Sequence, residues 1–196
     1  MNSLVIAASL LACTVAGCDS GRARCYDECE YRGEPSIMFC GERWSLDHPT
    51  VVCTSGRLTT DAFQPFFDLE KVVLSDVVLR AGRRPPNLRL RELYMMRVDL
   101  TGVDVSERFP ALTWLSVEDM AFDVHQLPRL RSLQFVFLRD TPAPDLGDLL
   151  ALPELRRVSM FRLRCGAPDC ARTLGQQLVR ARPALKVRAD GEALSP

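Results

Sequence analysis

Cysteine and histidine are the residues of this chain that are best suited to chemistry. The chain has 196 residues, with eight cysteines and two histidines. Cys25 and Cys29 are separated by three residues, a spacing close to that of paired zinc ligands. No C-x2-C pair follows them, however, and His48 and His125 lie too far apart to form a ligand pair. The cysteines therefore predict disulfides, and we expect no metal site and no cofactor.

The sequence offers few groups for catalysis. His48 stands directly before a proline, and His125 lies in VHQLP, away from the segments expected to form strands. No G-x-S-x-G stretch and no phosphate-binding loop occurs. Glu118 and Asp119 are adjacent carboxylates, but neighbouring residues of a strand face opposite ways. We therefore expect a protein that is not an enzyme.

Composition places the chain among ordinary folded proteins. Apolar residues make up 47% and charged residues 26%, and the formal net charge is zero. A nucleic-acid partner is not expected, because such binding relies on an excess of positive charge.

The first 17 residues, MNSLVIAASLLACTVAG, carry no charged side chain and contain an apolar run of secretory length. They predict a signal peptide over residues 1–17, cleaved before Cys18, and a secreted, extracellular protein. The run is too short to span a membrane, and no apolar segment of about 20 residues follows, so no transmembrane segment is expected. VAGC also resembles the lipobox of bacterial lipoproteins, which leaves attachment to a membrane through a lipidated Cys18 as an alternative.

An unusual spacing of apolar residues recurs along the chain. The stretch LEKVVLSDVVL, residues 69–79, has apolar residues at offsets 0, 3, 5, 8 and 10, which fits neither a helix nor a half-buried strand. Related stretches begin near residues 48, 90, 112, 130 and 155, so the starts from 69 onward are 21, 22, 18 and 25 residues apart. Such recurrence is typical of repeats that cannot bury their apolar sides alone. We expect offsets 3 and 5 to point into a shared core from a short strand.

These stretches resemble the leucine-rich repeat family, L-x-x-L-x-L-x-x-N-x-L at a period of about 20–29 residues. CGERWSL and VVCTSGRLT are similar to the cysteine-containing N-terminal cap of its extracellular subtype. The resemblance implies an α/β solenoid, a leucine-rich repeat horseshoe with short parallel β-strands on its concave face and disulfide-stapled caps at both ends. It divides the chain into a cysteine-rich cap (18–47), about six repeats (48–165), and a C-terminal cap with a polar tail (166–196). The family's asparagine is absent from its position, which leaves the turn geometry open.

The cysteines are concentrated near the two ends of the repeats. Cys165 and Cys170 begin the C-terminal cap, and we predict a bridge between them. They precede CARTLGQQLVRARP, whose apolar spacing is helix-like, and ALKV, which offers a last strand. For the N-terminal cysteines the family resemblance implies alternating pairs, Cys25 with Cys40 and Cys29 with Cys53.

Strand residues between the core positions are expected to face outward on the concave sheet. Large apolar side chains set among charges in such places are typical of a protein-binding patch. We predict ligand binding through Lys71, Val73, Tyr94, Met96, Trp114, Glu118, Val136, Phe137, Arg157, Phe161 and Arg162. Tyr94, Trp114 and Phe161 are the expected anchors, and the alternative is that these side chains pack against one another.

Two functions remain open from the sequence. The first is a secreted module for adhesion, recognition or immune-type binding, which takes a protein ligand on the concave face. The second is a structural or matrix component, or a bacterial-type lipoprotein, that binds an acidic partner or glycan through arginine-rich C-terminal repeats. Residues 155–188 contain eight arginines and one lysine against one acid. The arginines expected to act in the second case are Arg156, Arg157, Arg162 and Arg164.

Overall fold

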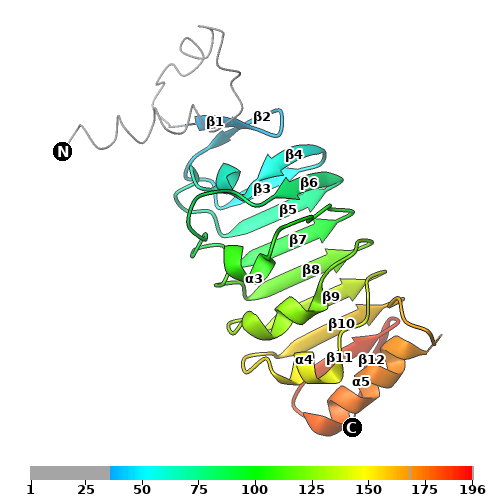
Figure 1. The fold of residues 1–196 in the computed structure, drawn as a ribbon. Helices are drawn as coiled ribbons and strands as arrows, with labels where there is room; N and C mark the ends of the chain where they lie inside the picture. The colour runs from blue at the N-terminus through cyan, green and yellow to red at the C-terminus, as the bar shows by residue number, and fades with distance from the viewer. Residues whose placement is uncertain (1–35, 168, 196) are drawn as a thin grey trace, which may run out of the picture.

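The computed structural model describes residues 36–167 and 169–195. Within them the strands are stacked one beside the next along an elongated molecule, from β1 at one end to β12 and α5 at the other (Figure 1). The predicted signal peptide, Cys18, Cys25 and Cys29 lie outside the described residues.

The main sheet has eight strands in the order β12-β11-β10-β9-β8-β7-β5-β3. From β3 to β11 each strand is parallel to its neighbour, and β12 pairs antiparallel with β11. The bounds of these strands are β3 Thr50–Cys53, β5 Lys71–Ser75, β7 Glu92–Met96, β8 Trp114–Glu118, β9 Phe135–Arg139, β10 Arg157–Phe161, β11 Lys186–Ala189 and β12 Glu192–Leu194.

Smaller elements surround this sheet. An antiparallel hairpin, β1 (Ser36–Phe39) and β2 (Glu42–Ser45), precedes it, and β4 (Gly56–Thr59) pairs in parallel with β6 (Val77–Arg80). The connecting helices are η1 Thr60–Phe63, α3 Val105–Arg108, η2 Val124–Arg129, α4 Leu146–Leu150 and α5 Cys170–Ala181. Among the described helices, none combines the length and apolar character needed to cross a membrane.

Alternate residues of each main strand are buried on one face of the sheet. In β5, Val72 and Leu74 are 0% and 1% exposed, whereas Lys71, Val73 and Ser75 are partly exposed. The strands β7, β8 and β10 bury their second and fourth residues in the same way. The expectation that offsets 3 and 5 point into the core is therefore confirmed for the stretches that begin at residues 69, 90, 112 and 155.

The stretch predicted to begin at residue 130 has a different register. Val136 and Leu138 are buried at 2% and 0% exposure, and Phe135 lies on the opposite face beside Trp114 of β8. The stretch therefore begins at Leu133, and the successive starts 69, 90, 112, 133 and 155 lie 21, 22, 21 and 22 residues apart. The placement of Val136 on the binding surface is wrong, because a one-residue shift moves a strand residue to the other face.

The predicted fold class, an α/β solenoid in the form of a leucine-rich repeat horseshoe, is wrong. The main sheet is mixed, because β12 runs antiparallel to β11. Helix is scarce in the described residues, since α3 and α4 have four and five residues and α5 has 12. Prolines such as Pro85, Pro86 and Pro128 occupy the connecting segments and remove backbone donors that a longer helix would need. The described residues form an elongated mixed sheet and show no obvious horseshoe.

Two disulfides lie near the ends of the described chain. Cys165 is bonded to Cys170, which confirms that predicted bridge. Cys40 is bonded to Cys53, so the pairings of Cys40 with Cys25 and of Cys53 with Cys29 are wrong. The Cys40–Cys53 bond joins the β1–β2 hairpin to the first strand of the main sheet, an arrangement that spacing alone does not specify.

The C-terminal end of the core is covered by α5 and the last strands. Leu174, Leu178 and Val179 of α5 are buried, and the predicted helix and the strand that follows it are both present. Gly175 lies against Val187 and Leu194, so close that a Cβ atom there would stand 2.6 Å from the Leu194 Cδ1. The absence of a side chain at Gly175 thus lets α5 approach the sheet.

Candidate functional site

The face of the main sheet opposite the core is here named the open face. It carries the residues that alternate with the buried ones in β5 and β7 to β10, and all of them except Ser116 are at least partly exposed. Its members are Lys71, Val73, Ser75, Glu92, Tyr94, Met96, Trp114, Ser116, Glu118, Phe135, Phe137, Arg139, Arg157, Ser159 and Phe161.

Three aromatic rings on the open face stack on one another across neighbouring strands. The ring centroids of Tyr94 and Trp114 are 6.0 Å apart with planes 26° from parallel, and those of Trp114 and Phe135 are 4.8 Å apart at 27°. Parallel pairing of β7, β8 and β9 at the strand spacing brings these side chains into contact. Each such contact adds about 0.5–1.5 kcal/mol beyond simple burial.

A positively charged side chain lies over the ring at each end of this stack. The Lys71 Nζ lies 4.5 Å from the centroid of the Tyr94 ring, and the Arg157 guanidinium lies 5.8 Å from that of Phe135. Positive charge over an aromatic face is attracted by the ring quadrupole. The five residues Lys71, Tyr94, Trp114, Phe135 and Arg157, one from each of five adjacent strands, are here named the aromatic row.

Glu92 fixes the β5 end of the aromatic row. Its carboxylate accepts a hydrogen bond from the Tyr94 hydroxyl at 3.1 Å and pairs with the Lys71 ammonium at 3.6 Å. Burial, followed by the charge and the hydrogen bond of Glu92, raises the pKa of Tyr94 to about 12. The phenol therefore stays protonated at neutral pH and holds its ring in place.

The stacking decides which parts of the rings are open to a partner. Trp114 has Tyr94 on one side and Phe135 on the other, so both faces of its ring are occupied and only part of its edge can meet solvent. Its indole Nε1 is buried and has no acceptor among the described residues. The aromatic row thus presents a rigid band of ring edges between two positive charges.

A second aromatic pair lies farther along the open face. The ring centroids of Phe137 and Phe161 are 5.4 Å apart, and both side chains are half-buried. Phe161 does not belong to the aromatic row, so the three predicted anchors lie in two separate clusters. These contacts agree with the alternative expectation, in which the apolar side chains of this face pack against one another.

Charged residues line the edge of the sheet where the strands end. Asp76, Arg97, Asp119, Asp140 and Arg162 each follow a main strand and have positive φ angles of 45–56°. This set is here named the charged rim. The backbone N–H of its first four members donates to a carbonyl of the next strand at 2.8–3.1 Å, and the N–H of Arg162 donates to the Asp190 carboxylate at 2.9 Å.

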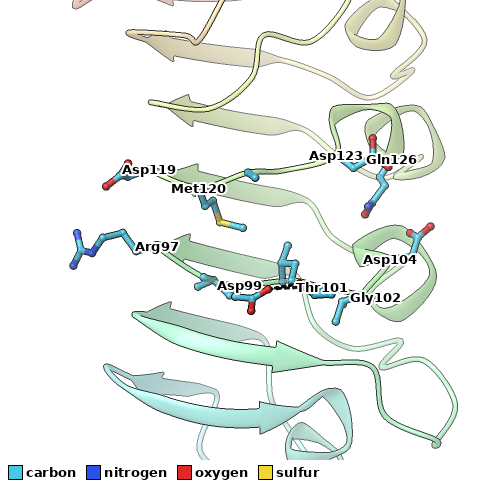
Figure 2. Close-up of a pocket in the computed structure, with 13 residues that line it drawn as sticks. Arg97, Asp99, Thr101, Gly102, Asp104, Asp119, Met120, Asp123 and Gln126 are labelled. Carbon is cyan, nitrogen blue, oxygen red and sulfur yellow. Dashed lines mark hydrogen bonds between the residues drawn. The ribbon is translucent and has the colours of Figure 1, made fainter.

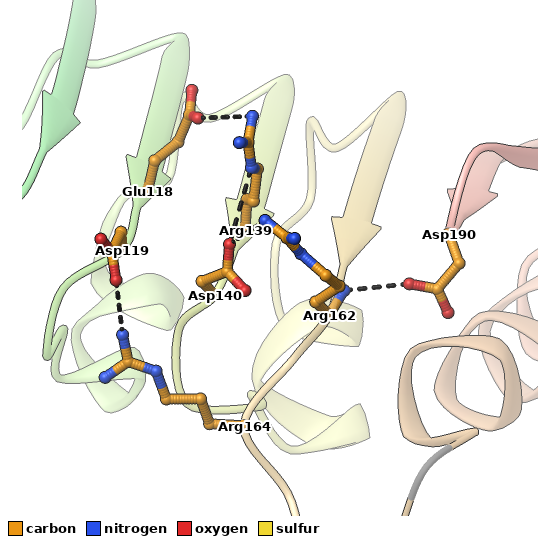
Figure 3. Close-up of polar contacts among 7 residues, drawn as sticks. All are labelled: Glu118, Asp119, Arg139, Asp140, Arg162, Arg164 and Asp190. Atoms are coloured by element: carbon orange, nitrogen blue, oxygen red, sulfur yellow. Dashed lines mark hydrogen bonds and ion pairs between the residues drawn. The ribbon is translucent and has the colours of Figure 1, made fainter.

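The side chains of the charged rim form ion pairs with one another and with nearby residues (Figure 3). Arg97 contacts Asp76 at 2.7 Å and Arg162 contacts Asp140 at 2.5 Å. Hydrogen bonds from Arg97 and then from Ser75 lower the pKa of Asp76 to about 2. Arg162, a predicted ligand-binding residue, is thus engaged by Asp140.

Two more of the residues predicted to bind a partner, Glu118 and Arg164, also form ion pairs. Glu118 of the open face pairs with Arg139 at 3.3 Å, and Arg164 reaches Asp119 at 3.0 Å. The remaining predicted residues Lys71, Val73, Met96, Phe137 and Arg157 lie on the open face, half-buried except for the exposed Arg157. Phe135 was missed, and the regular spacing that starts at Leu133 was the signal that identifies it.

A shallow groove of about 730 Å³ lies on the loops that follow β7 and β8. Arg97 and Asp119 stand at one end of it, and Asp104, Asp123 and Gln126 at the other (Figure 2). Its acids have structural partners. Asp104 and Asp123 cap α3 and η2, respectively, and Asp99 accepts hydrogen bonds from Thr101. The groove was not predicted, and its polar groups stabilise the loops that form it.

A scan against protein-family models found no match, and a search of curated proteins found none either. Membership of the leucine-rich repeat family therefore stays a prediction.

Proposed function

We propose that this chain is an exported binding protein that holds a protein ligand on the open face, with the aromatic row at the centre of the contact. The observation that carries the proposal is the aromatic row itself, five side chains from five adjacent strands held in one continuous contact. Partly exposed aromatic and cationic side chains in such a setting are characteristic of binding hot spots.

Preorganisation supports this function. Tyr94, Trp114 and Phe135 are immobilised by stacking before any partner arrives, so binding costs little side-chain entropy. A sugar ring would need a free aromatic face for stacking, and both faces of Trp114 are occupied. A protein partner, whose apolar side chains can contact ring edges, fits the open face better.

Export is part of the proposal and rests on two kinds of observation. The bonds Cys40–Cys53 and Cys165–Cys170 fit an oxidising compartment, and the described helices include no membrane-spanning candidate. The apolar leader read from residues 1–17 supports the same placement.

A pull-down from the extracellular fluid of the source organism tests this function. The bait is the wild-type chain beside the double variant Trp114→Ala with Phe135→Ala. The matched control is Leu88→Ala, because Leu88 is 66% exposed and lies outside the main strands. We expect one protein to be retained by the wild type and by Leu88→Ala but not by the folded double variant. Equal retention by all three baits would rule out the aromatic row as the binding surface.

A second candidate function is recognition of an acidic partner or sulfated glycan. Arg157, Lys186 and Arg188 are exposed and adjacent by strand register, and within the described ranges no carboxylate lies within ion-pair distance of them. Arg162 and Arg164, expected to take this role, are instead paired with Asp140 and Asp119. Positive charge without a carboxylate partner is thus concentrated at the β10–β11 end of the open face.

Chromatography on heparin and on a plain cation exchanger tests the second candidate. The wild type should elute from heparin at higher salt than from the exchanger, and the triple variant Arg157→Ser, Lys186→Ser, Arg188→Ser should lose that difference. The matched control Arg162→Ser should keep it. Equal elution of the wild type from both columns would remove this candidate.

A further inference from the structure

His125 meets two carboxylates on the loop side of the molecule, away from the open face. It belongs to η2, while Asp145 directly precedes α4 and Asp148 lies within α4. The His125 Nδ1 is 3.1 Å from the Asp148 Oδ2, and one donor atom of each of the three residues lies within 4.8 Å of the others. Two successive connecting segments thus bring a nitrogen and two oxygen donors together.

Asp145 differs from Asp104 and Asp123, which precede the two connecting helices before it, whereas Asp169 before α5 likewise makes no capping hydrogen bond. The carboxylate of Asp104 accepts hydrogen bonds from the first backbone N–H groups of α3, and that of Asp123 accepts one from η2. Asp145 occupies the same position before α4, yet its side chain makes no capping hydrogen bond. An aspartate before a helix is ordinarily engaged by the backbone, so this carboxylate is available to another group.

We propose that His125, Asp145 and Asp148 form a surface site for a divalent transition metal such as Zn²⁺. A metal at about 2.0–2.2 Å from each donor needs those donors about 3.5 Å apart, which small rotations of exposed side chains supply from the present arrangement. His125 and Asp145 are exposed, so their side chains are free to make this adjustment.

The donor set determines the class of ion. One imidazole nitrogen with two carboxylate oxygens suits zinc and its neighbours, whereas Ca²⁺ and Mg²⁺ prefer oxygen donors alone. Three protein ligands leave at least one coordination position for water or for a ligand supplied by another molecule. The site is independent of the proposed binding on the open face.

Calorimetric titration of the full chain with Zn²⁺, disulfides formed, tests this proposal. We expect one saturable site in the wild type and affinity at least about tenfold weaker in His125→Ala and in Asp145→Asn. His48→Ala is the matched control, because the chain has two histidines and His48 lies in the turn before β3. Asp145→Asn is informative because it leaves the His125–Asp148 contact in place and removes no capping hydrogen bond from α4.

A stability measurement gives a second readout on the same proteins. Zinc that binds the folded state raises the melting temperature of the wild type and of His48→Ala, and this rise should be smaller in His125→Ala and Asp145→Asn. Mg²⁺ at the same concentration should leave all four unchanged. The proposal would be overturned if zinc bound the wild type, His125→Ala and Asp145→Asn with the same affinity and raised their melting temperatures equally.

Discussion

The aromatic row and the charged rim cross the same stack of strands, yet they are built from opposite kinds of contact. In the aromatic row, half-buried rings lie against each other and against two cations. In the charged rim, exposed side chains form ion pairs, and backbone N–H groups bond to the next strand. Surface ion pairs contribute about 0–1 kcal/mol, whereas a large ring removed from water contributes several times more. We therefore expect the aromatic row to contribute to stability and binding, and the charged rim chiefly to shape the turns that follow the main strands.

The largest expected effect comes from removing the middle ring of the aromatic row. Trp114→Ala should lower the free energy of unfolding by about 2 kcal/mol, less than for a fully buried tryptophan because Trp114 is half-buried. Urea denaturation measures this change, and Leu88→Ala should shift the midpoint little. If Trp114→Ala lowered the free energy of unfolding no more than Leu88→Ala does, stacking of the Trp114 ring would contribute nothing to stability.

Alkaline pH should weaken the aromatic row selectively. The pKa of Tyr94 in the fold is about 12, above its ordinary value of 10, so its contribution is complete below pH 10 and is lost as pH rises toward 12. Unfolding followed from pH 9 to 12 should show a steeper loss in the wild type than in Tyr94→Phe, which cannot titrate. Identical slopes would mean that burial and Glu92 do not raise the pKa of Tyr94 in the fold.

The charged rim offers a substitution that should increase stability. Arg162 has a φ of 45°, a conformation that costs an ordinary side chain about 1–2 kcal/mol and asparagine less. Arg162→Asn should therefore raise the free energy of unfolding by about 0.5 kcal/mol, because the relief exceeds the value of the exposed ion pair with Asp140. The control is Arg164→Asn, since Arg164 is not among the residues with positive φ. A clear loss of stability in Arg162→Asn would give the ion pair the larger role.

The smallest expected effect is on stability at acid pH. The pKa of Asp76 is about 2 in the fold, below the ordinary value of 3.8, so its contribution is complete above pH 4 and is lost as pH falls toward 2. Stability measured between pH 5 and 2 should fall slightly more in the wild type than in Asp76→Asn. The reverse order would contradict the assigned direction of the shift.

The buried half of each strand could be predicted from the sequence, and the open half only in part. Alternation of apolar residues identified Val72, Leu74 and their equivalents, because burial of one face of a strand imposes a period of two. In FVFLR every residue before the arginine is apolar, so hydrophobicity alone did not choose between two registers. The even spacing of starts at 112, 133 and 155 resolves that choice.

Long-range pairings account for most of what sequence reasoning missed. Nothing local distinguishes a Cys40–Cys53 bond from the alternatives, or shows that β12 turns back along β11. The argument against a metal considered cysteines and a second histidine, and so overlooked carboxylates that the next connecting segment brings to His125. Similarly, the stacking of Tyr94, Trp114 and Phe135 depends on strand register.

Fluorescence of Trp114 in the presence of the captured partner tests the central claim most directly. The chain has two tryptophans, and Trp44→Phe leaves Trp114 as the sole reporter on the open face. If the aromatic row is the binding surface, adding the protein recovered in the pull-down should shift the emission of Trp114 and reduce its quenching by acrylamide. Saturating binding of that partner with emission and quenching unchanged would contradict the account.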